Sequence, residues 1–141
     1  MGRVRLDLPE TFDFSTEIDV RITDINYGGH LGNDSTLSLI HEVRVRFLQK
    51  HGYREVNVEG VGMVMTDAVI IYKAEVFYGD TLIAEIGVGD ITRSGCDFYY
   101  RFTKKDTGKE VTRAKTSIVF FDFKVRKLAE TPGKFREKFA K

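Results

Sequence analysis

The feature that most constrains this sequence is one segment, Thr36 to Lys50, which would be apolar on nearly every face of a helix. Its apolar residues are Leu37, Leu39, Ile40, Val43, Val45, Phe47 and Leu48. A helix at a protein surface carries a narrower apolar stripe, so this pattern predicts a helix that other elements bury. Either Asp34 or Ser35 can cap its start, and Gly52 is the expected stop.

The remaining sequence is typical of strands separated by glycine turns. Residues Thr16 to Ile22 alternate apolar and charged side chains, which is the period of a half-buried strand. Four further β segments are expected between Val61 and Phe123. Their apolar sets are Met63, Met65, Val69, Ile71 and Val76; Leu82, Ala84, Ile86 and Val88; Cys96, Phe98, Tyr100 and Phe102; and Thr112, Ala114, Thr116, Ile118 and Phe120. Short connections such as Tyr78-Gly79-Asp80 predict that successive segments pair as antiparallel hairpins.

A buried helix needs a sheet around it, because no other large element is available in this chain. The sequence therefore predicts an α+β fold in which a five-stranded antiparallel sheet wraps around one central helix. Thr131 and Pro132 are expected to cap and begin a short final helix that carries Phe135 and Phe139. With 141 residues, the chain is predicted to form a single domain over residues 1–141. Its sheet edges would stay uncovered, so we expect a homo-oligomer, either a dimer or a tetramer.

Composition and charge exclude several classes of protein. The 22 Lys and Arg residues nearly balance 21 Asp and Glu residues, so the net charge is +1 and no nucleic-acid partner is expected. The single cysteine, Cys96, excludes an intrachain disulfide and suits a reducing compartment. His30, His41 and His51 lack an acidic or thiolate set at ligand spacing, so no metal site is predicted. No apolar run approaches the ~18–20 residues that span a bilayer, and the N-terminus lacks the apolar core of a signal peptide, so we expect no membrane association and a cytoplasmic location.

Polar residues gather between Thr23 and Phe47, where the first strand leads into the buried helix. Asp24 follows the strand, the turn Gly29-His30-Leu31-Gly32-Asn33 precedes the helix, and the pair Glu42-Val43-Arg44 lies on the helix. Glycines allow this loop backbone angles that other residues avoid, so a tightly folded loop is expected at the helix start. The candidate functional residues are therefore concentrated in one short stretch of the chain.

These motifs resemble those of a known enzyme family. Later parts of the chain add an apolar strand that reaches Tyr72, a Gly79-Asp80-Thr81-Leu82 turn and a closing strand from Ala114 to Asp122. Over about residues 15 to 125 the sequence resembles the hot-dog acyl-CoA thioesterases typified by hydroxybenzoyl-CoA and long-chain acyl-CoA thioesterases. The resemblance implies a hot-dog fold and hydrolysis of an acyl-CoA or acyl-ACP thioester to free acid and thiol. It implies no cofactor other than the coenzyme A that forms part of the substrate.

Thioester hydrolysis needs a base or nucleophile and donors for the carbonyl oxygen as it becomes an oxyanion. Asp24 could attack the thioester or activate a water, although an Asp after a strand is also a common turn residue. Backbone N–H groups at the helix start, around Gly29, His30, Leu31 and Asn33, are predicted to bind the carbonyl oxygen. The first prediction is thus a carboxylate and an oxyanion site on either side of the glycine loop.

Two other residues have alternative readings. His30 could donate to the carbonyl or fix the loop through a backbone hydrogen bond. Glu42 is expected among apolar neighbours, where a carboxylate must be paired or catalytic, so it is the alternative base. Arg44 lies about 200° around the helix from Glu42, so we expect it to pair elsewhere. Alternative functions are an acyl-thioester hydratase or dehydratase, with His30 and Glu42 as the acid–base pair, and a non-catalytic acyl-CoA-binding module.

Overall fold

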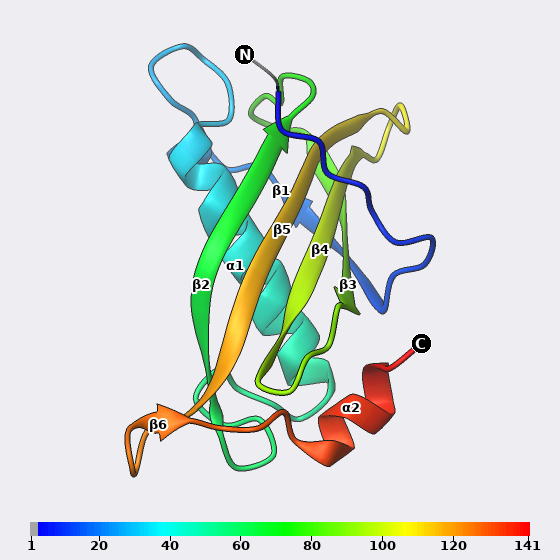
Figure 1. The fold of residues 1–141 in the computed structure, drawn as a ribbon. Coiled ribbons are helices and arrows are strands. Elements are labelled where there is room, and N and C mark those ends of the chain that lie inside the picture. Colours follow the sequence, from blue (N-terminus) through cyan, green and yellow to red (C-terminus); the bar gives the residue numbers. More distant parts are fainter. Residues whose placement is uncertain (1–2) are drawn as a thin grey trace.

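A computed structural model describes residues 3–141 of the chain (Figure 1). In chain order the elements are β1 (Phe14–Asp19), a 3-10 turn η1 (Ile22–Asp24), α1 (Asn33–Lys50), β2 (Gly62–Tyr72), β3 (Thr81–Gly89), β4 (Gly95–Lys104), β5 (Glu110–Asp122), β6 (Lys127–Leu128) and α2 (Gly133–Phe139). The strand order is β1-β3-β4-β5-β2, all neighbours are antiparallel, and β6 pairs only with the end of β5. The predicted antiparallel sheet with one central helix is confirmed, and the two-residue β6 is an addition to it.

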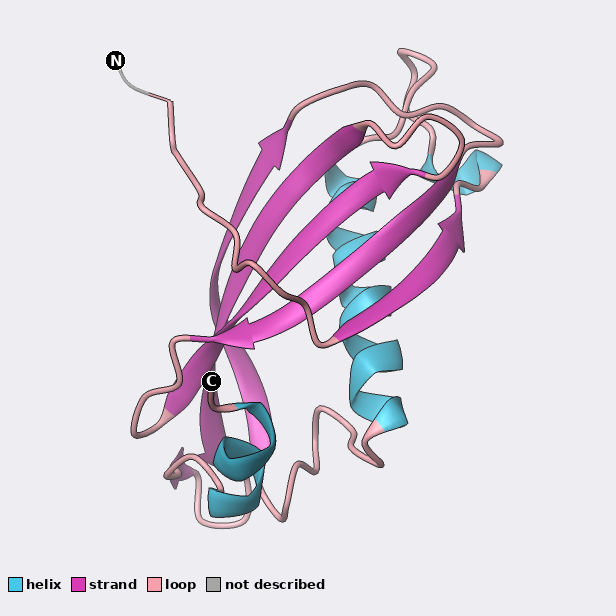
Figure 2. Cartoon of the chain, turned by 90° about the vertical axis from the view of Figure 1, so that its right-hand side faces the viewer, coloured by secondary structure: helices cyan, strands magenta, loops and turns pink. Residues whose placement is uncertain are grey.

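Figure 2 shows α1 on the concave side of the sheet, and the buried residues of the core lie on α1 and on the sheet that curves around it. The inward residues of β3, β4 and β5 follow the predicted alternation and are buried: Leu82, Ala84, Ile86, Val88, Cys96, Phe98, Tyr100, Phe102, Thr112, Ala114, Thr116, Ile118 and Phe120. Phe47 of α1 meets Phe98 of β4 edge to face, with ring centroids 6.1 Å apart. Aromatic and branched side chains therefore fill the space between helix and sheet, which is the largest source of stability in such a fold.

The helix α1 is less enclosed than the sequence predicts. Its inner side, which includes Ile40, Val43 and Phe47, is fully buried, but Leu37 is 38% exposed and the neighbouring outward positions are open to solvent. A single sheet covers only one side of a helix, so the expectation of burial on nearly every face is wrong for one copy of the chain. The helix also begins earlier than predicted, because Gly32, and not Asp34 or Ser35, occupies the cap position.

The strand β2 differs most from its prediction. Its register with β5 shifts between Met65 and Asp67, where a β-bulge adds a residue and exchanges the two faces of the strand. As a result Val69 and Ile71, which were expected to face the core, pair with outward residues of β5. The strand also ends at Tyr72 and pairs with β5, not with the following strand β3. The predicted hairpin between β2 and β3 is therefore wrong, because the eight residues 73–80 cross from one side of the sheet to the other.

Smaller corrections concern the two ends of the fold. The first strand ends at Asp19, and Ile22 lies in η1, where it is 66% exposed, so it does not continue the inward set of β1. Near the C-terminus Pro132 is the cap of α2, while the hydroxyl of Thr131 donates to the Thr92 carbonyl at 2.7 Å. The prediction for α2 is thus shifted by one residue. Its buried side chains, Phe135 and Phe139, are as predicted.

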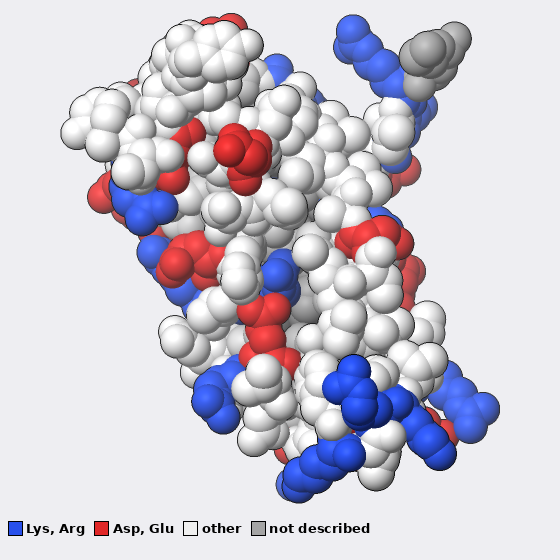
Figure 3. Space-filling model, turned by 90° about the vertical axis from the view of Figure 1, so that its left-hand side faces the viewer, with Lys and Arg blue, Asp and Glu red and all other residues white. Residues whose placement is uncertain are grey.

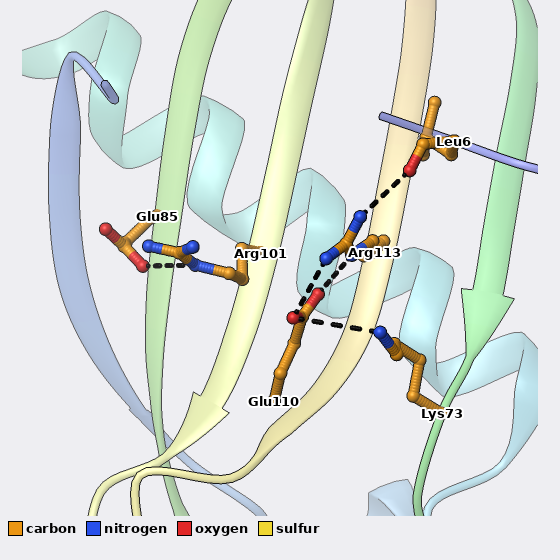
Figure 4. Close-up of polar contacts among 6 residues, drawn as sticks. All are labelled: Leu6, Lys73, Glu85, Arg101, Glu110 and Arg113. Carbon is orange, nitrogen blue, oxygen red and sulfur yellow. Dashed lines mark hydrogen bonds and ion pairs between the residues drawn. The ribbon is translucent and has the colours of Figure 1, made fainter. Parts of the chain in front are cut away.

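The outer face of the sheet carries ion pairs and is crossed by the N-terminal segment (Figure 4). Arg101 of β4 pairs with Glu85 of β3 at 3.0 Å. On β5 the Arg113 guanidinium binds Glu110 and also donates to the Leu6 carbonyl at 3.1 Å. The outer face therefore carries charged side chains, which the buried inward positions of β3, β4 and β5 lack, as the alternation of the strands allows.

Candidate functional site

The loop between η1 and α1 is fixed by its own backbone hydrogen bonds. The amide of Asn26 donates to the His30 carbonyl at 2.9 Å, and the amide of Gly32 donates to the Asp24 carbonyl at 3.1 Å. The side chain of Asn26 accepts from the Gly28 amide at 2.9 Å. The positive φ of Gly29, 86°, is closed to most other residues, so a glycine is required there. The predicted tight folding of this loop is confirmed.

A hollow of about 240 Å³ opens where this loop meets the end of β2. It is lined by residues from the loop, the first turn of α1, the segment after β2 and β5: His30, Leu31, Asn33, Thr36, Tyr72, Lys73, Ala74, Glu75, Val76 and Thr112. The Leu31 amide donates to the Val76 carbonyl at 2.7 Å, which joins the loop to the segment after β2. Three of the predicted site residues, His30, Leu31 and Asn33, thus lie together in one cavity.

Backbone donors at the start of α1 lie at the edge of this hollow, which Asn33 lines. The first intrahelical hydrogen bond runs from the Thr36 amide to the Gly32 carbonyl, so the amides of Asn33, Asp34 and Ser35 have no acceptor one turn earlier. They carry the positive end of the helix dipole and can stabilise an oxyanion. The amides of Gly29 and Leu31 are used within the fold, by the Asn26 and Val76 carbonyls. Of the predicted donors, Asn33 is therefore the one that lies in the first turn of α1, and the binding of a carbonyl oxygen by these amides stays a prediction.

Asp24 is buried directly beneath the loop, with 3% of its surface exposed. Its Oδ2 accepts from the Arg21 amide at 2.9 Å, and its Oδ1 accepts from Arg21 Nη2 at 3.2 Å. That hydrogen bond and the charge of Asp24 raise the pKa of the Arg21 guanidinium. The carboxylate lies outside the lining of the hollow and faces Arg21, so a catalytic role for Asp24 stays a prediction.

Glu42 lies in a different place from the one that the sequence indicates. Its side chain is 50% exposed and binds Arg46 one turn later, with 2.7 Å between Oε2 and Nε. Together with Arg21 and β1 it lines a second hollow of about 400 Å³. The expectation of an apolar environment for Glu42 is wrong, because the sheet does not cover this side of α1. Its role as the alternative base stays a prediction.

Both roles predicted for His30, donor to the carbonyl and residue that fixes the loop, stay predictions. Its ring lines the hollow, and Nδ1 lies 3.4 Å from the Leu31 carbonyl, a weak contact within the loop. Asp24, His30 and Glu42 are therefore not brought together by the fold of one chain. Asp24 is buried beneath the loop, His30 lines the first hollow, and Glu42 lines the second.

The structure adds residues to the site that sequence reasoning missed. Tyr72 at the end of β2 donates to the Asn33 carbonyl at 3.3 Å, and burial, with the charge of Asp34, raises the pKa of its phenol. Its hydroxyl stays protonated and lies beside the helix start. Thr36, fully buried, donates to the Gly32 carbonyl at 2.9 Å. In the sequence Tyr72 is recognisable as the end of a strand, and Thr36 as the start of the helix. Neither position indicates that the two residues share a cavity.

The described part of the chain offers neither a metal-binding cluster nor a membrane-spanning helix. Among residues 3–141 no three His, Cys, Asp or Glu side chains converge in a way that could hold a metal ion. Arg44, which was expected to pair away from Glu42, binds Glu55 and the Tyr100 hydroxyl. Neither helix in the described part of the chain has the length and apolar character needed to cross a membrane.

Comparisons with known proteins identify the family. A family model described as the thioesterase-like superfamily matches residues 20–139. No curated protein matches the sequence. The 1,4-dihydroxy-2-naphthoyl-CoA thioesterase of Synechocystis aligns with a TM-score of 0.79 at 20% identity, over 87% of this chain and 92% of its own. A gentisyl-coenzyme A thioesterase aligns with a TM-score of 0.78 at 16% identity, over 90% and 100%. The 12:0-ACP thioesterase of Umbellularia californica aligns with a TM-score of 0.77 at 15% identity, over 88% and 48%.

At these identities the solved structures establish the fold, and they confirm the predicted hot-dog architecture. The family model covers most of the chain, from the end of β1 to the end of α2. It confirms the resemblance carried by the motifs of the glycine loop and the expected class of reaction, hydrolysis of a thioester. The chain therefore belongs to the thioesterase-like superfamily.

Proposed function

We propose that this chain is an acyl-CoA thioesterase that holds the thioester carbonyl in the hollow at the start of α1. The observation that carries this proposal is the set of three helix-start amides, those of Asn33, Asp34 and Ser35, beside an open cavity of about 240 Å³. As the carbonyl carbon is attacked, its oxygen gains charge that these N–H groups stabilise without a cationic side chain. The Tyr72 hydroxyl donates its one hydrogen to the Asn33 carbonyl and so holds the end of β2 against the same turn.

The attacking group is proposed to be Asp24 or a water that Asp24 activates. The position of Asp24 supports this role, because its main-chain carbonyl accepts a hydrogen bond from the Gly32 amide at the cap of α1. Asp24 is thereby fixed close to the start of the helix. Attack forms the tetrahedral intermediate, and its collapse breaks the carbon–sulfur bond and releases coenzyme A as the thiolate. If Asp24 itself attacks, this collapse leaves a mixed anhydride on Asp24 that water then hydrolyses; if Asp24 activates a water, the proton that it accepts passes to the thiolate. In both routes water supplies the second oxygen of the free acid and the proton of the thiol. Because the carboxylate now faces Arg21, a small change in the loop must precede attack.

The substitution Asp24→Asn tests this assignment, because it keeps the size of the side chain and one of its two acceptor oxygens while it removes the charge. We expect thiol release from a panel of acyl-CoAs to fall by ~10²-fold or more in kcat, with folding preserved. The matched variant is Glu42→Gln, which removes the exposed carboxylate on α1. Unchanged turnover in Asp24→Asn together with a large loss in Glu42→Gln would transfer the role to Glu42.

The oxyanion site has its own test in Gly29, whose φ of 86° is unfavourable for a β-branched residue. Gly29→Val should lower kcat more than His30→Ala does, because it displaces the loop that sets the helix start. Gly108→Val is the matched control, since Gly108 has a φ of 75° in a remote turn and, like Gly29, nothing within 4 Å of an added Cβ. A folded Gly29→Val variant with full turnover would show that the carbonyl does not bind here.

The hydratase alternative receives less support from the geometry. It requires His30 and Glu42 as an acid–base pair on one substrate, but these side chains line separate hollows. We propose coenzyme A, and not an acyl carrier protein, as the carrier of the thioester, because two of the three solved structures described above are named as coenzyme A thioesterases. The buried, unpaired thiol of Cys96 supports the cytoplasm as the compartment, because thiols stay reduced there.

We also propose that two copies associate along β2, which is the last strand at one end of the sheet order. Val64 and Met65 are 38% and 43% exposed, and a two-fold axis would pair the two β2 edges antiparallel. On this side of the molecule Lys and Arg gather at the lower end, and much of the upper part is uncharged (Figure 3). This arrangement would place a second copy next to the hollow at Tyr72.

Light scattering at micromolar concentration tests the association. We expect the mass of a dimer or tetramer, and a shift toward monomer in Met65→Lys, because a charge on an edge strand opposes pairing. Ser15→Lys, on the exposed edge strand β1 at the other end of the sheet, is the control and should keep the mass of the unmodified chain. A monomeric mass for the unmodified chain would overturn the proposed association.

A further inference from the structure

A chain of polar side chains runs through the apolar core, from the surface of α1 to the concave face of the sheet. Arg44, with a side chain only 6% exposed, donates from Nε to Glu55 at 3.3 Å and from Nη1 to the Tyr100 hydroxyl at 3.1 Å. The Tyr100 hydroxyl lies 2.8 Å from Thr116 Oγ1 on β5. At the outer end His41 Nε2 lies 2.6 Å from the other oxygen of Glu55. The charge of Arg44 is thus fixed at a defined place inside the core.

A buried charge of this kind is weak evidence for a stabilising role. Replacing a buried ionic group by apolar residues of similar volume is often neutral or stabilising, because desolvation offsets the attraction between the charges. Burial alone would lower the pKa of Arg44, but Tyr100 and Glu55 overcome it and the guanidinium pKa is raised. Two contacts engage Nε and Nη1. The planar group carries two more N–H bonds on Nη2, which can serve a ligand.

A slot leads to this guanidinium between α1 and the inner side of β2. After the bulge, the inward positions of β2 are those paired with buried residues of β5: Ala68 with Thr116, Ile70 with Ala114, and Tyr72 with Thr112. Ala68 is exposed and Tyr72 is 50% exposed although both point to the concave face, and Met65, opposite buried Ile118, is 43% exposed. The sheet and the helix therefore do not close on one another along β2. Figure 3, which views this side, shows a surface that is hollowed near its centre.

The slot continues from the proposed thioester site. Tyr72 lines the hollow at the start of α1, and Ala68, two inward positions earlier on β2, pairs with Thr116. The Thr116 hydroxyl lies 2.8 Å from the Tyr100 hydroxyl that binds Arg44. From Thr36 in the hollow to Arg44 the helix advances by eight residues, which is ~12 Å at ~1.5 Å per residue. Helical side chains lean toward the N-terminus, so the guanidinium lies roughly 6–9 Å from the thioester site. That is about the length of a medium acyl chain.

We propose that Arg44 is a specificity-determining residue that donates a hydrogen bond to an oxygen at the far end of the acyl group, so that the enzyme prefers hydroxylated over plain alkyl thioesters. This inference rests on the proposed thioesterase function. Glu55 already balances the charge of Arg44, so a neutral hydroxyl or keto oxygen fits better than a carboxylate, which would bring an unbalanced charge into the core. Tyr100 and Glu55 are positioning residues, because they hold the guanidinium and touch no substrate atom.

The experiment measures kcat/KM of the purified chain for matched pairs of acyl-CoAs. Butanoyl-, hexanoyl- and octanoyl-CoA are each compared with their ω-hydroxy derivatives, and adipyl-CoA supplies a terminal carboxylate. We expect the hydroxylated member to be preferred by ~10-fold or more at one of these lengths, since a site built to hydrogen-bond a hydroxyl discriminates against its absence. Arg44→Met, which keeps an unbranched apolar stem, should lower that ratio by ~5-fold or more.

Two further variants separate specificity from structure. Tyr100→Phe removes the hydroxyl that positions the Arg44 guanidinium and should lower the same ratio by ~3-fold or more. Tyr99→Phe is the matched control, because Tyr99 is the next residue on β4, faces the outer side and binds Asp90, so the ratio should not change. A purely structural role would change the melting temperature of the inner variants and leave the substrate ratio as it was.

The outcomes are distinguishable. A ratio near one at all three lengths, a preference for adipyl-CoA, or an unchanged ratio in folded Arg44→Met overturns the assignment to Arg44 while thioesterase activity stands. If Arg44→Met does not fold, the ratio in Tyr100→Phe decides alone. Absence of hydrolysis for every acyl-CoA contradicts the proposed function itself.

Discussion

The two faces of the sheet use the same polar residue types in opposite ways. On the inner face the largely buried Arg44 of α1 reaches Tyr100 of β4, whereas on the outer face Arg101 of the same strand pairs with Glu85 in contact with water. The side chain of Arg44 is 6% exposed and that of Arg101 is 38% exposed. The outer pairs, drawn in Figure 4, can form or break at little cost. The inner one fixes a charge where it is costly, so its position carries information about function.

Apolar residues also differ between the two faces, because adjacent residues of one strand point to opposite sides of the sheet. Phe120 and Phe121 are adjacent on β5, and only Phe120 is fully buried. We expect Phe120→Ala to lower the free energy of unfolding by ~3–5 kcal/mol, the usual cost of a large cavity in a core. Phe121→Ala should cost less than ~1.5 kcal/mol. Urea titration followed by circular dichroism measures both, and equal costs would contradict the assignment of faces on β5.

The two arginines give the next largest difference. Arg44→Ala should lower the free energy of unfolding by ~2–3 kcal/mol, because it leaves Glu55 and the Tyr100 hydroxyl without their donor and opens a cavity. Glu55 is partly exposed and Tyr100 still has Thr116, which limits the loss. Arg101→Ala should cost less than ~1 kcal/mol, as for other exposed pairs. Chemical denaturation of both variants in the same buffer tests the contrast, which fails if Arg101→Ala is the more destabilising.

A third test uses pH and His51, which lies at the end of α1. Its ring packs against Phe47 and Phe139, and burial, followed by the charges of Lys138 and Lys50, lowers its pKa. The unfolded chain, with a histidine pKa of about 6.5, then binds more protons than the folded chain. Stability should therefore fall as the pH drops through about 6.5 and level off below the folded pKa.

The matched variant His51→Phe removes this titration and keeps an aromatic ring in the packing. The difference in melting temperature between the two proteins should shift in favour of His51→Phe as the pH is lowered from neutral to about 5. Scanning calorimetry at a series of pH values measures it. A difference independent of pH would show that His51 is not buried as a neutral group in solution.

The smallest effect is expected on the outer face, at Glu110. Burial would raise the pKa of its carboxyl, but the hydrogen bond and charge of Arg113, together with Lys73, lower it below the ordinary value. Its contribution is thus present above a pH of about 4.3 and is lost as the pH falls through the folded pKa. Glu110→Gln should lower the free energy of unfolding by less than ~1 kcal/mol at neutral pH, and less still at high salt. A loss that salt does not reduce would contradict this reading.

Elements with regular periodicity could be predicted from the sequence, and irregular ones could not. Strands β3, β4 and β5 keep their alternation from Leu82 to Phe120, and each predicted inward side chain is buried. The bulge after Met65 has no sequence signal of its own, so one inserted position reversed the predicted face of Val69 and Ile71. The prediction that β2 pairs with β3 was wrong for a related reason. Periodicity identifies a strand but not its neighbour, and β2 lies beside β5 instead of β3.

The candidate site shows the same division. The motif from Asp24 to Asn33 predicted a tight glycine loop at a helix start, and local hydrogen bonds between near neighbours confirm it. Whether a side chain of that motif faces a common cavity depends on distant segments. His30 lies in the hollow because residues 72–76 cross in front of it, and Glu42 does not, because no strand covers its side of α1.

By itself the sequence determined the class of fold, the central helix, the position of the glycine loop and the thioesterase family, because these depend on local periodicity and on motifs of neighbouring residues. Only the tertiary structure decided which strands pair, where β2 reverses its faces, and that Arg44 meets Tyr100, which lies 56 residues away in the chain. Contacts of this kind follow from how the sheet closes around the helix. They are selected by the burial of many side chains at once, and no short segment of sequence encodes them.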